Sequence, residues 1–115
     1  MIVYISIGNS DDKLGQLGWH QLADETDRAI SRVARYEGVR VHGRWYSLPN
    51  EPWQNACWCV QFADDPAMSA VAGSLREALG GLARTYRQDA IVWAVADVEY
   101  IRSRDCTTTP REDTR

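Results

Sequence analysis

The chain shows two kinds of hydrophobic pattern, and they follow one another in a defined order. Segments in which apolar and polar residues alternate predict strands over 2–7, 39–47 and 55–62, and a strongly apolar segment predicts a further strand over 90–101. Segments in which apolar residues recur every three or four positions predict helices over 17–36 and 66–86. The expected order is therefore strand, helix, strand, strand, helix, strand.

This order of elements is that of a ferredoxin-like βαββαβ sandwich, which is an α+β fold. In such a sandwich two helices cover one face of a four-stranded antiparallel sheet, and the first and third strands occupy its centre. The opposite face of the sheet has no helix over it. We therefore expect one bare sheet face, and we expect the function to involve covering it.

The second helix and the last strand carry further indications. Asp65 followed by Pro66 is a typical helix start, because Asp caps the free N–H groups and Pro suits the first turn. Gly80-Gly81 in mid-helix costs about 2 kcal/mol in helix propensity and predicts a kink or a close helix contact. The last strand is apolar on both sides, which indicates that a second copy or the folded-back tail covers its second side.

Residues 1–101 are expected to form a single domain, followed by a flexible polar tail over 102–115. A chain of 115 residues with 44% hydrophobic residues can bury one core without a metal or a disulfide. Three cysteines, two of them in Cys57-Trp58-Cys59, do not suit a secreted disulfide framework. No apolar segment is long enough to span a bilayer, so we expect a cytoplasmic protein with no membrane partner.

The second strand contributes a ladder of basic and aromatic residues to the bare face. Strict alternation places Val39, Val41 and Trp45 on the core side of this strand. It places the ladder on the other side, formed by Arg40, His42, Arg44 and Tyr46. The neighbouring strands add Tyr4, Cys57, Cys59 and Gln61 to the same face. This set predicts a surface that binds a partner or a ligand.

The aromatic composition also favours an interface. The chain has five Trp and five Tyr but a single Phe, and Trp and Tyr combine a large apolar area with a polar group. The loop before the third strand contains Trp53 and Gln54 between polar and proline residues. An exposed Trp in a loop is a frequent interface anchor. Packing of Trp53 against the edge of the core is the alternative reading.

Charge limits the choice of partner. A net charge of −3 provides no basic field that would attract nucleic acid, which is therefore not an expected partner. Gly8-Asn9-Ser10 precedes the first helix and could present backbone N–H groups to an anion, so a nucleotide or another small ligand stays open.

We expect a non-catalytic binding module that needs no cofactor. It would act through the bare sheet face and the aromatic loop, either as a homodimer or as a small inhibitory or accessory protein that binds a protein partner, of the kind carried by mobile elements and phages. The expected binding residues are Tyr4, Asn9, Arg40, His42, Arg44, Tyr46, Trp53 and Gln54. No residue is assigned a catalytic role.

The alternative is an enzyme or a nucleotide-binding protein. The loop after the first strand resembles, in its topological position alone, the loop where several ferredoxin-like phosphodiesterases hold a metal-binding acid. Asp11 and Asp12 would bind Mg²⁺ against a phosphate in that case, since hard oxygen ligands suit this ion. Local capping of the turn by these Asp side chains is the structural explanation for the same residues.

The two hypotheses predict different results in a hydrolysis assay. For a binding module we expect no Mg²⁺-dependent cleavage of phosphodiester substrates by the wild-type protein. Measurable cleavage that disappears in the Asp11→Ala, Asp12→Ala double variant, with the circular dichroism spectrum unchanged, would establish the enzyme instead.

Overall fold

The computed structural model describes residues 1–9, 14–51, 54–97 and 99–104. Its elements follow the expected order. They are β1 (Ile2–Gly8), α1 (Gln16–Ala34), β2 (Val39–Tyr46), β3 (Asn55–Phe62), α2 (Pro66–Thr85) and β4 (Val92–Ala96).

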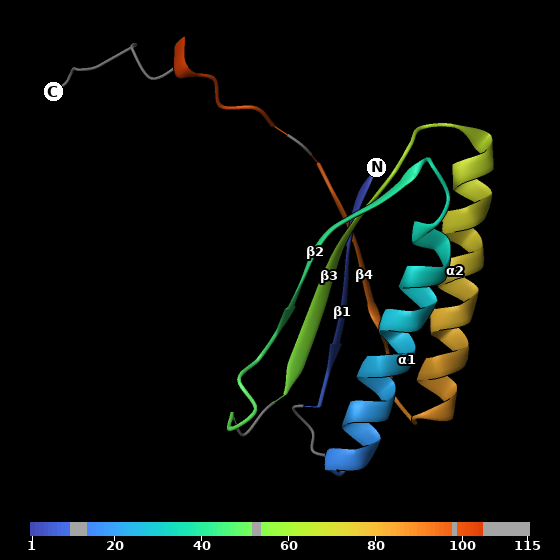
Figure 1. Ribbon diagram of the computed structural model, residues 1–115, viewed down its shortest axis with the longest axis vertical. Coiled ribbons are helices and arrows are strands. Elements are labelled where there is room, and N and C mark those ends of the chain that lie inside the picture. Colours follow the sequence, from blue (N-terminus) through green and yellow to red (C-terminus); the bar gives the residue numbers. More distant parts are fainter. Residues whose placement is uncertain (10–13, 52–53, 98, 105–115) are drawn as a thin grey trace, which may run out of the picture.

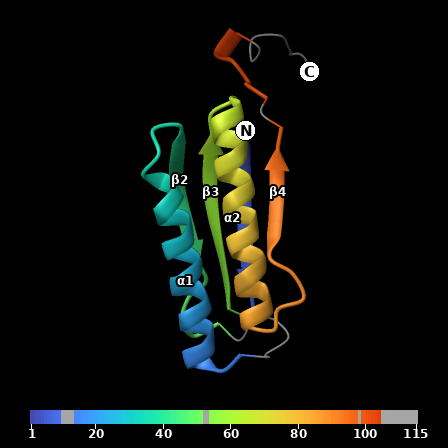
Figure 2. The same cartoon turned by 90° about the vertical axis from the view of Figure 1, so that its right-hand side faces the viewer.

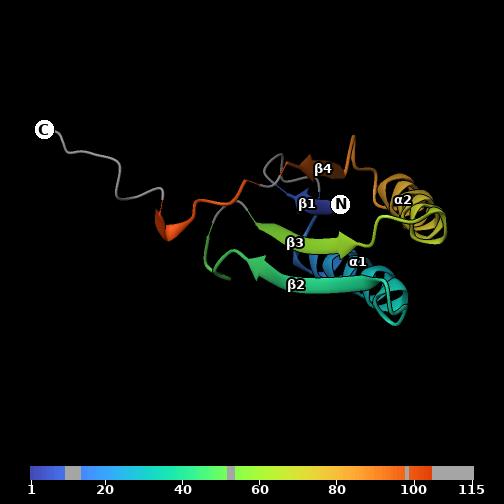
Figure 3. The ribbon, with the colours of Figure 1, turned by 90° about the horizontal axis from the view of Figure 1, so that it is seen from above.

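The four strands form one antiparallel sheet in the order β2-β3-β1-β4. Figure 3 shows the strands side by side in this order, with β1 and β3 in the centre as predicted. Both helices lie against the same side of the sheet (Figures 1 and 2). The α+β class, the four-stranded antiparallel sheet and the two helices are confirmed.

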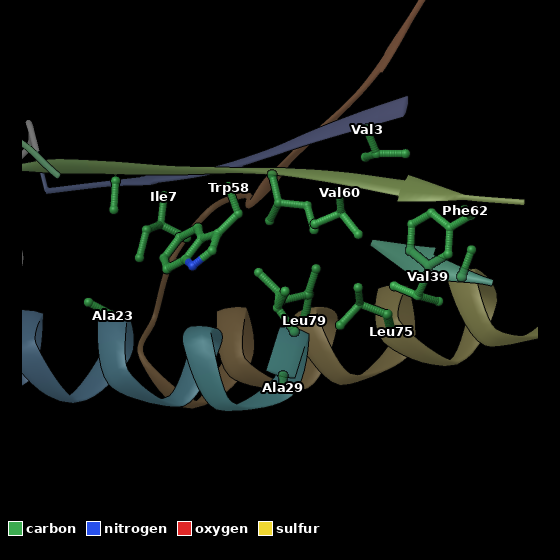
Figure 4. Close-up of a cluster of buried hydrophobic side chains, with 14 of the residues drawn as sticks. Val3, Ile7, Ala23, Ala29, Val39, Trp58, Val60, Phe62, Leu75 and Leu79 are labelled. Carbon is green, nitrogen blue, oxygen red and sulfur yellow. The ribbon is translucent and has the colours of Figure 1, made fainter. Parts of the chain in front are cut away.

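The core fills the space between the sheet and the helices (Figure 4). Every second residue of the central strands points into it, and these residues are buried: Val3, Ile5 and Ile7 from β1, and Ala56, Trp58, Val60 and Phe62 from β3. Leu22 and Ile30 of α1 and Leu75 and Leu79 of α2 close the core from the other side. The helical spacing and the strand alternation thus meet in one apolar layer.

Helix α2 begins as its sequence predicts. Asp65 is the N-cap, and its carboxylate accepts a hydrogen bond of 2.9 Å from the backbone N–H of Met68. Gly38, which lies between α1 and β2, packs closely against α2. A Cβ atom there would lie 2.6 Å from Met68 Sδ, so a larger residue would displace the Met68 side chain.

A β-bulge in β2 contradicts one sequence prediction. Val41 pairs with Val60 and Gly43 pairs with Cys59, so His42 is an extra residue without its own partner in β3. Because one inserted residue reverses the alternation, all following side chains change face. Arg44 and Tyr46 therefore point to the helix side and Trp45 points to the bare side, the reverse of the prediction.

The extent of the last strand was predicted wrongly, and one of the two alternatives for the glycine pair in α2, a close helix contact, is contradicted. Strand β4 covers only Val92–Ala96 instead of 90–101, because its pairing with β1 runs from Ser6 to Ile2 and ends there. The glycine pair in α2 does not mark a close helix contact in the described part of the chain. A Cβ atom at Gly80 would meet nothing within 4 Å, and one at Gly81 would meet only the tip of Arg84 at 3.9 Å.

The bulge creates an interaction between β2, β3 and α1. Trp58 is only 1% exposed, and its indole Nε1–H donates a hydrogen bond of 2.9 Å to Asp27 on α1. Arg44 forms a salt bridge with the same carboxylate oxygen. Tyr46 packs edge-on against the Trp58 ring, with 5.8 Å between the ring centroids. Asp27 thus satisfies a buried donor while its own charge is paired.

The Asp27→Ala variant is expected to lose about 1–3 kcal/mol of unfolding free energy, because it leaves the buried Trp58 N–H without an acceptor. Urea denaturation measures this loss. Asp24→Ala is the matched control, since Asp24 forms an exposed pair with Arg28 on the same helix. Its expected loss is below about 0.5 kcal/mol. Equal losses of unfolding free energy in the two variants would show that the Trp58 hydrogen bond contributes no more to stability than the exposed pair of Asp24 does.

Candidate functional site

The sheet face that points away from the helices is the candidate site, and we refer to it as the open face. The strand register assigns to it Tyr4 and Ser6 of β1, Arg40, Gly43 and Trp45 of β2, Cys57, Cys59 and Gln61 of β3, and Val92 and Ala94 of β4. The predicted placement on this face of the sheet is confirmed for Tyr4, Arg40, Cys57, Cys59 and Gln61. It missed Trp45, which the bulge brings to this face.

A hollow of about 210 Å³ lies in the open face. Its lining consists of Tyr4, Gly43, Arg44, Trp45, Cys57 and Cys59. Trp45 is 58% exposed and Tyr4 is 44% exposed. A Cβ atom at Gly43 would meet nothing within 4 Å, so the missing side chain leaves the space between these rings empty. Two large aromatic side chains beside a depression form a typical docking feature.

Two free thiols lie between the aromatic side chains. Cys57 and Cys59 are half-buried and point to the same side of β3. The Ser6 hydroxyl donates a hydrogen bond of 3.3 Å to the Cys57 sulfur. Cys59 pairs across the sheet with Tyr4, and its hydrogen bond, followed by its charge, raises the pKa of the Tyr4 hydroxyl. The thiols thus line the hollow from β3, the strand that lies between the strands of Tyr4 and Trp45.

The polar end of the open face lies near the start of β2. Arg40 is exposed and lies opposite Gln61 in the register. The bulge residue His42 forms a hydrogen bond of 2.7 Å between its Nε2 and Gln61 Oε1. Three of the predicted polar residues are therefore brought together here, at a distance along the strand from Trp45.

Arg44 and Tyr46, which were expected in the same ladder, serve the helix side instead. The hydrogen bond and the charge of Asp27 raise the pKa of Arg44 and keep its guanidinium charged. Burial, together with the negative charge of Asp27, raises the pKa of the Tyr46 hydroxyl. Both groups stabilise the contact between β2 and α1, which contradicts their predicted position on the binding face.

Asn9 and Gln54 are also engaged within the protein. Both are buried. The Asn9 amide donates to the Leu14 carbonyl at 2.8 Å and accepts from the Leu14 N–H at 3.0 Å. The Gln54 amide donates to the carbonyls of Leu48 and Glu51 at 2.9 and 2.8 Å. These amides therefore make hydrogen bonds within the protein. Their predicted role in ligand binding stays a prediction.

Asp11, Asp12 and Trp53 lie outside the described residues. In the part of the chain that is described, no three His, Cys, Asp or Glu side chains gather so that they could hold a metal ion. Within the same ranges, neither helix has the length and apolar character needed to cross a membrane.

A local signal for the missed residue exists in the sequence. Gly43 interrupts a strand that otherwise favours extended structure, and an isolated glycine within a strand is typical of a bulge. A bulge placed next to Gly43 predicts that Trp45 faces away from the core. A regular alternation without a bulge is also compatible with the sequence, because it places the apolar Trp45 side chain on the core face.

Searches of the chain against protein-family models and against curated proteins find no match. The function of the open face therefore has to follow from its own geometry.

The link between Tyr4 and Cys59 is testable by titration. In the Cys59→Ala variant the pKa of Tyr4 is expected to fall towards its ordinary value of 10.0, because the hydrogen bond that opposes ionisation is lost. The phenolate absorbance of each protein, minus that of the same protein carrying Tyr4→Phe, isolates this group. Cys57→Ala is the control, since Cys57 makes the smallest contribution to the pKa shift.

Ionisation of Tyr4 also makes the stability of the fold depend on pH. Since the folded-state pKa of Tyr4 is raised, its contribution to stability is fully present below about pH 10 and is lost as the pH rises through the folded pKa. A titration in which the two cysteine variants shift Tyr4 equally would contradict a specific role for Cys59.

Proposed function

We propose that the protein is a non-catalytic binding module that engages a protein partner through its open face. The observation that carries this proposal is the pair of exposed rings, Trp45 and Tyr4, on either side of a hollow in a sheet face that no helix covers. Trp and Tyr bury a large area at a small cost in conformational entropy, and they dominate the binding energy of many interfaces.

The charge of the open face favours a protein over a nucleic acid. Among the described strand residues that point away from the helices, Arg40 is the only Arg, Lys, Asp or Glu. The centres of protein interfaces are depleted in charge. A nucleic acid would instead require several cations along the phosphate backbone. Arg44, which could have added a second cation, is paired with Asp27 on the helix side.

The scaffold supports binding without rearrangement. We propose that it is a ferredoxin-like sandwich, and the strand order, with β1 and β3 at the centre, supports this assignment. Tyr4 and both cysteines stand on these two central strands, whose opposite faces are locked in the core. A preformed surface loses little entropy when a partner docks, which favours affinity.

The experiment compares wild-type protein with variants that alter only the hollow. The wild-type protein, immobilised, should retain one specific partner from a nuclease-treated lysate of the cells that produce it. After purification of that partner, Trp45→Ala should weaken the affinity at least tenfold in calorimetric titrations, which corresponds to about 1.4 kcal/mol. Gly43→Leu should weaken it similarly, because the new side chain fills the hollow.

Leu48→Ala is the matched control. Leu48 is exposed and apolar, but it lies in the loop after β2 and not on the open face. It should bind the partner like the wild type, and all variants should keep the wild-type melting temperature within a few degrees. A partner that binds Trp45→Ala and wild type equally would refute the proposal, as would the absence of any retained partner.

A further inference from the structure

Strand β4 is an unprotected edge of the sheet. It pairs with β1, and no other described strand lies along its outer side (Figure 2). Its sequence, Val-Trp-Ala-Val-Ala, contains no charge, no proline and no glycine. Val92 is 53% exposed and Val95 is 59% exposed. Apolar strands with free N–H and C=O groups readily pair with a further strand.

The opposite edge of the same sheet is protected. Strand β2 carries a bulge at its midpoint and has the charged residues Arg40 and Arg44 on either side of it. Bulges and charges are common devices that prevent pairing between sheet edges. The difference between the two edges indicates that β4 is left free for a partner strand.

A second hollow lies next to β4 on the helix side of the sheet. Its volume is about 200 Å³, and it is lined by Arg76, Leu79, Gly80 and Ala83 of α2 and by Ile91 and Trp93. The Arg76 guanidinium lies 5.4 Å from the centroid of the Trp93 ring. Gly80 has space beyond its Cα atom, since a Cβ atom there meets nothing within 4 Å. Side chains from an added strand therefore have room beside Trp93.

We infer that β4 pairs with β4 of a second copy of this chain, in antiparallel orientation and centred on Ala94. In this register Trp93 lies opposite the partner's Val95 on the helix side, and Val92 lies opposite the partner's Ala96 on the open face. Aromatic side chains paired with β-branched ones, and large side chains paired with small ones, stabilise antiparallel strands. The partner's Val95 falls next to the hollow along α2.

A second copy is the occupant that the strand sequence favours. An antiparallel pair about a twofold axis brings each residue opposite its counterpart in the other chain, so the strand must be compatible with itself. The absence of charge in β4 removes like-charge repulsion, and Ala94 at the axis keeps the two backbones free of a steric conflict. The pairing also satisfies the backbone N–H and C=O groups along the outer side of this strand.

The pairing extends the sheet from four strands to eight. Since the twofold axis is perpendicular to the sheet, both open faces point in the same direction. A dimer would present two copies of the Trp45 hollow on the same side. Two linked sites bind a partner that has two matching epitopes more tightly than one site does. The inference depends on the β4 edge alone and holds whatever the open face binds.

Disulfide trapping tests the register directly. In an antiparallel pair centred on Ala94, the two copies of this residue are neighbours, about 5 Å apart between Cα atoms. The two copies of Val92 are separated by about 14 Å, which is too far for a disulfide. Under mild oxidation, Ala94→Cys should therefore form a covalent dimer whose peptide map joins the two substituted positions, and Val92→Cys should not.

Sedimentation equilibrium of the full chain tests the assembly without cross-linking. The wild-type protein should approach twice the 13.0 kDa mass of one chain as its concentration rises. Val95→Lys should stay monomeric with an unchanged circular dichroism spectrum, because a charge at a mostly exposed edge position blocks pairing without disturbing the core. Leu48→Lys removes an equally exposed apolar residue near the other edge and should still dimerise.

Three results would overturn the inference. They are a wild-type protein that is monomeric at every soluble concentration, a Val95→Lys variant that still dimerises, and Val92→Cys cross-linking as efficient as that of Ala94→Cys. Failure of the open-face proposal is a separate result, since Trp45→Ala should dimerise normally and Val95→Lys monomers should keep a functional hollow.

Discussion

The hydrogen bond from the Trp58 indole to Asp27 is the constraint on which the arrangement of β2, β3 and α1 depends. An indole in the core brings one N–H group that must find an acceptor, and the acceptor here is a carboxylate. A carboxylate at the boundary of the core is tolerated at low cost only when a cation accompanies it. Arg44 supplies that cation, so one donor in the core fixes the identity of residues on two further elements.

The bulge at His42 is the means by which β2 satisfies this constraint. Without it, Arg44 would point away from Asp27, and Trp45 would have to fit beneath α1. One extra residue in the strand exchanges the two side chains. The same backbone irregularity therefore completes the polar contact behind the sheet and exposes an indole ring in front of it. Stability and surface chemistry share a single cause in this part of the molecule.

The sequence predicts the elements that bury one side against the common core, because apolar periodicity reports that burial directly. The helices α1 and α2 and the inner faces of β1 and β3 belong to this group. It does not predict the second half of β2, since one inserted residue reverses a pattern that otherwise looks regular. It does not predict the internal hydrogen bonds of Asn9 and Gln54, because the sequence does not distinguish an amide that binds a ligand from an amide that binds a nearby carbonyl.

Gly43 is a position of the open face that tolerates substitution, unlike the tightly packed positions of the core. Its backbone has no positive φ and its missing Cβ would meet no neighbour, so many residue types fit there without strain. A single codon can therefore set the depth of the cavity between Trp45 and Tyr4. Over evolutionary time the shape of this cavity can drift at this position while the packing beneath the sheet stays under separate selection.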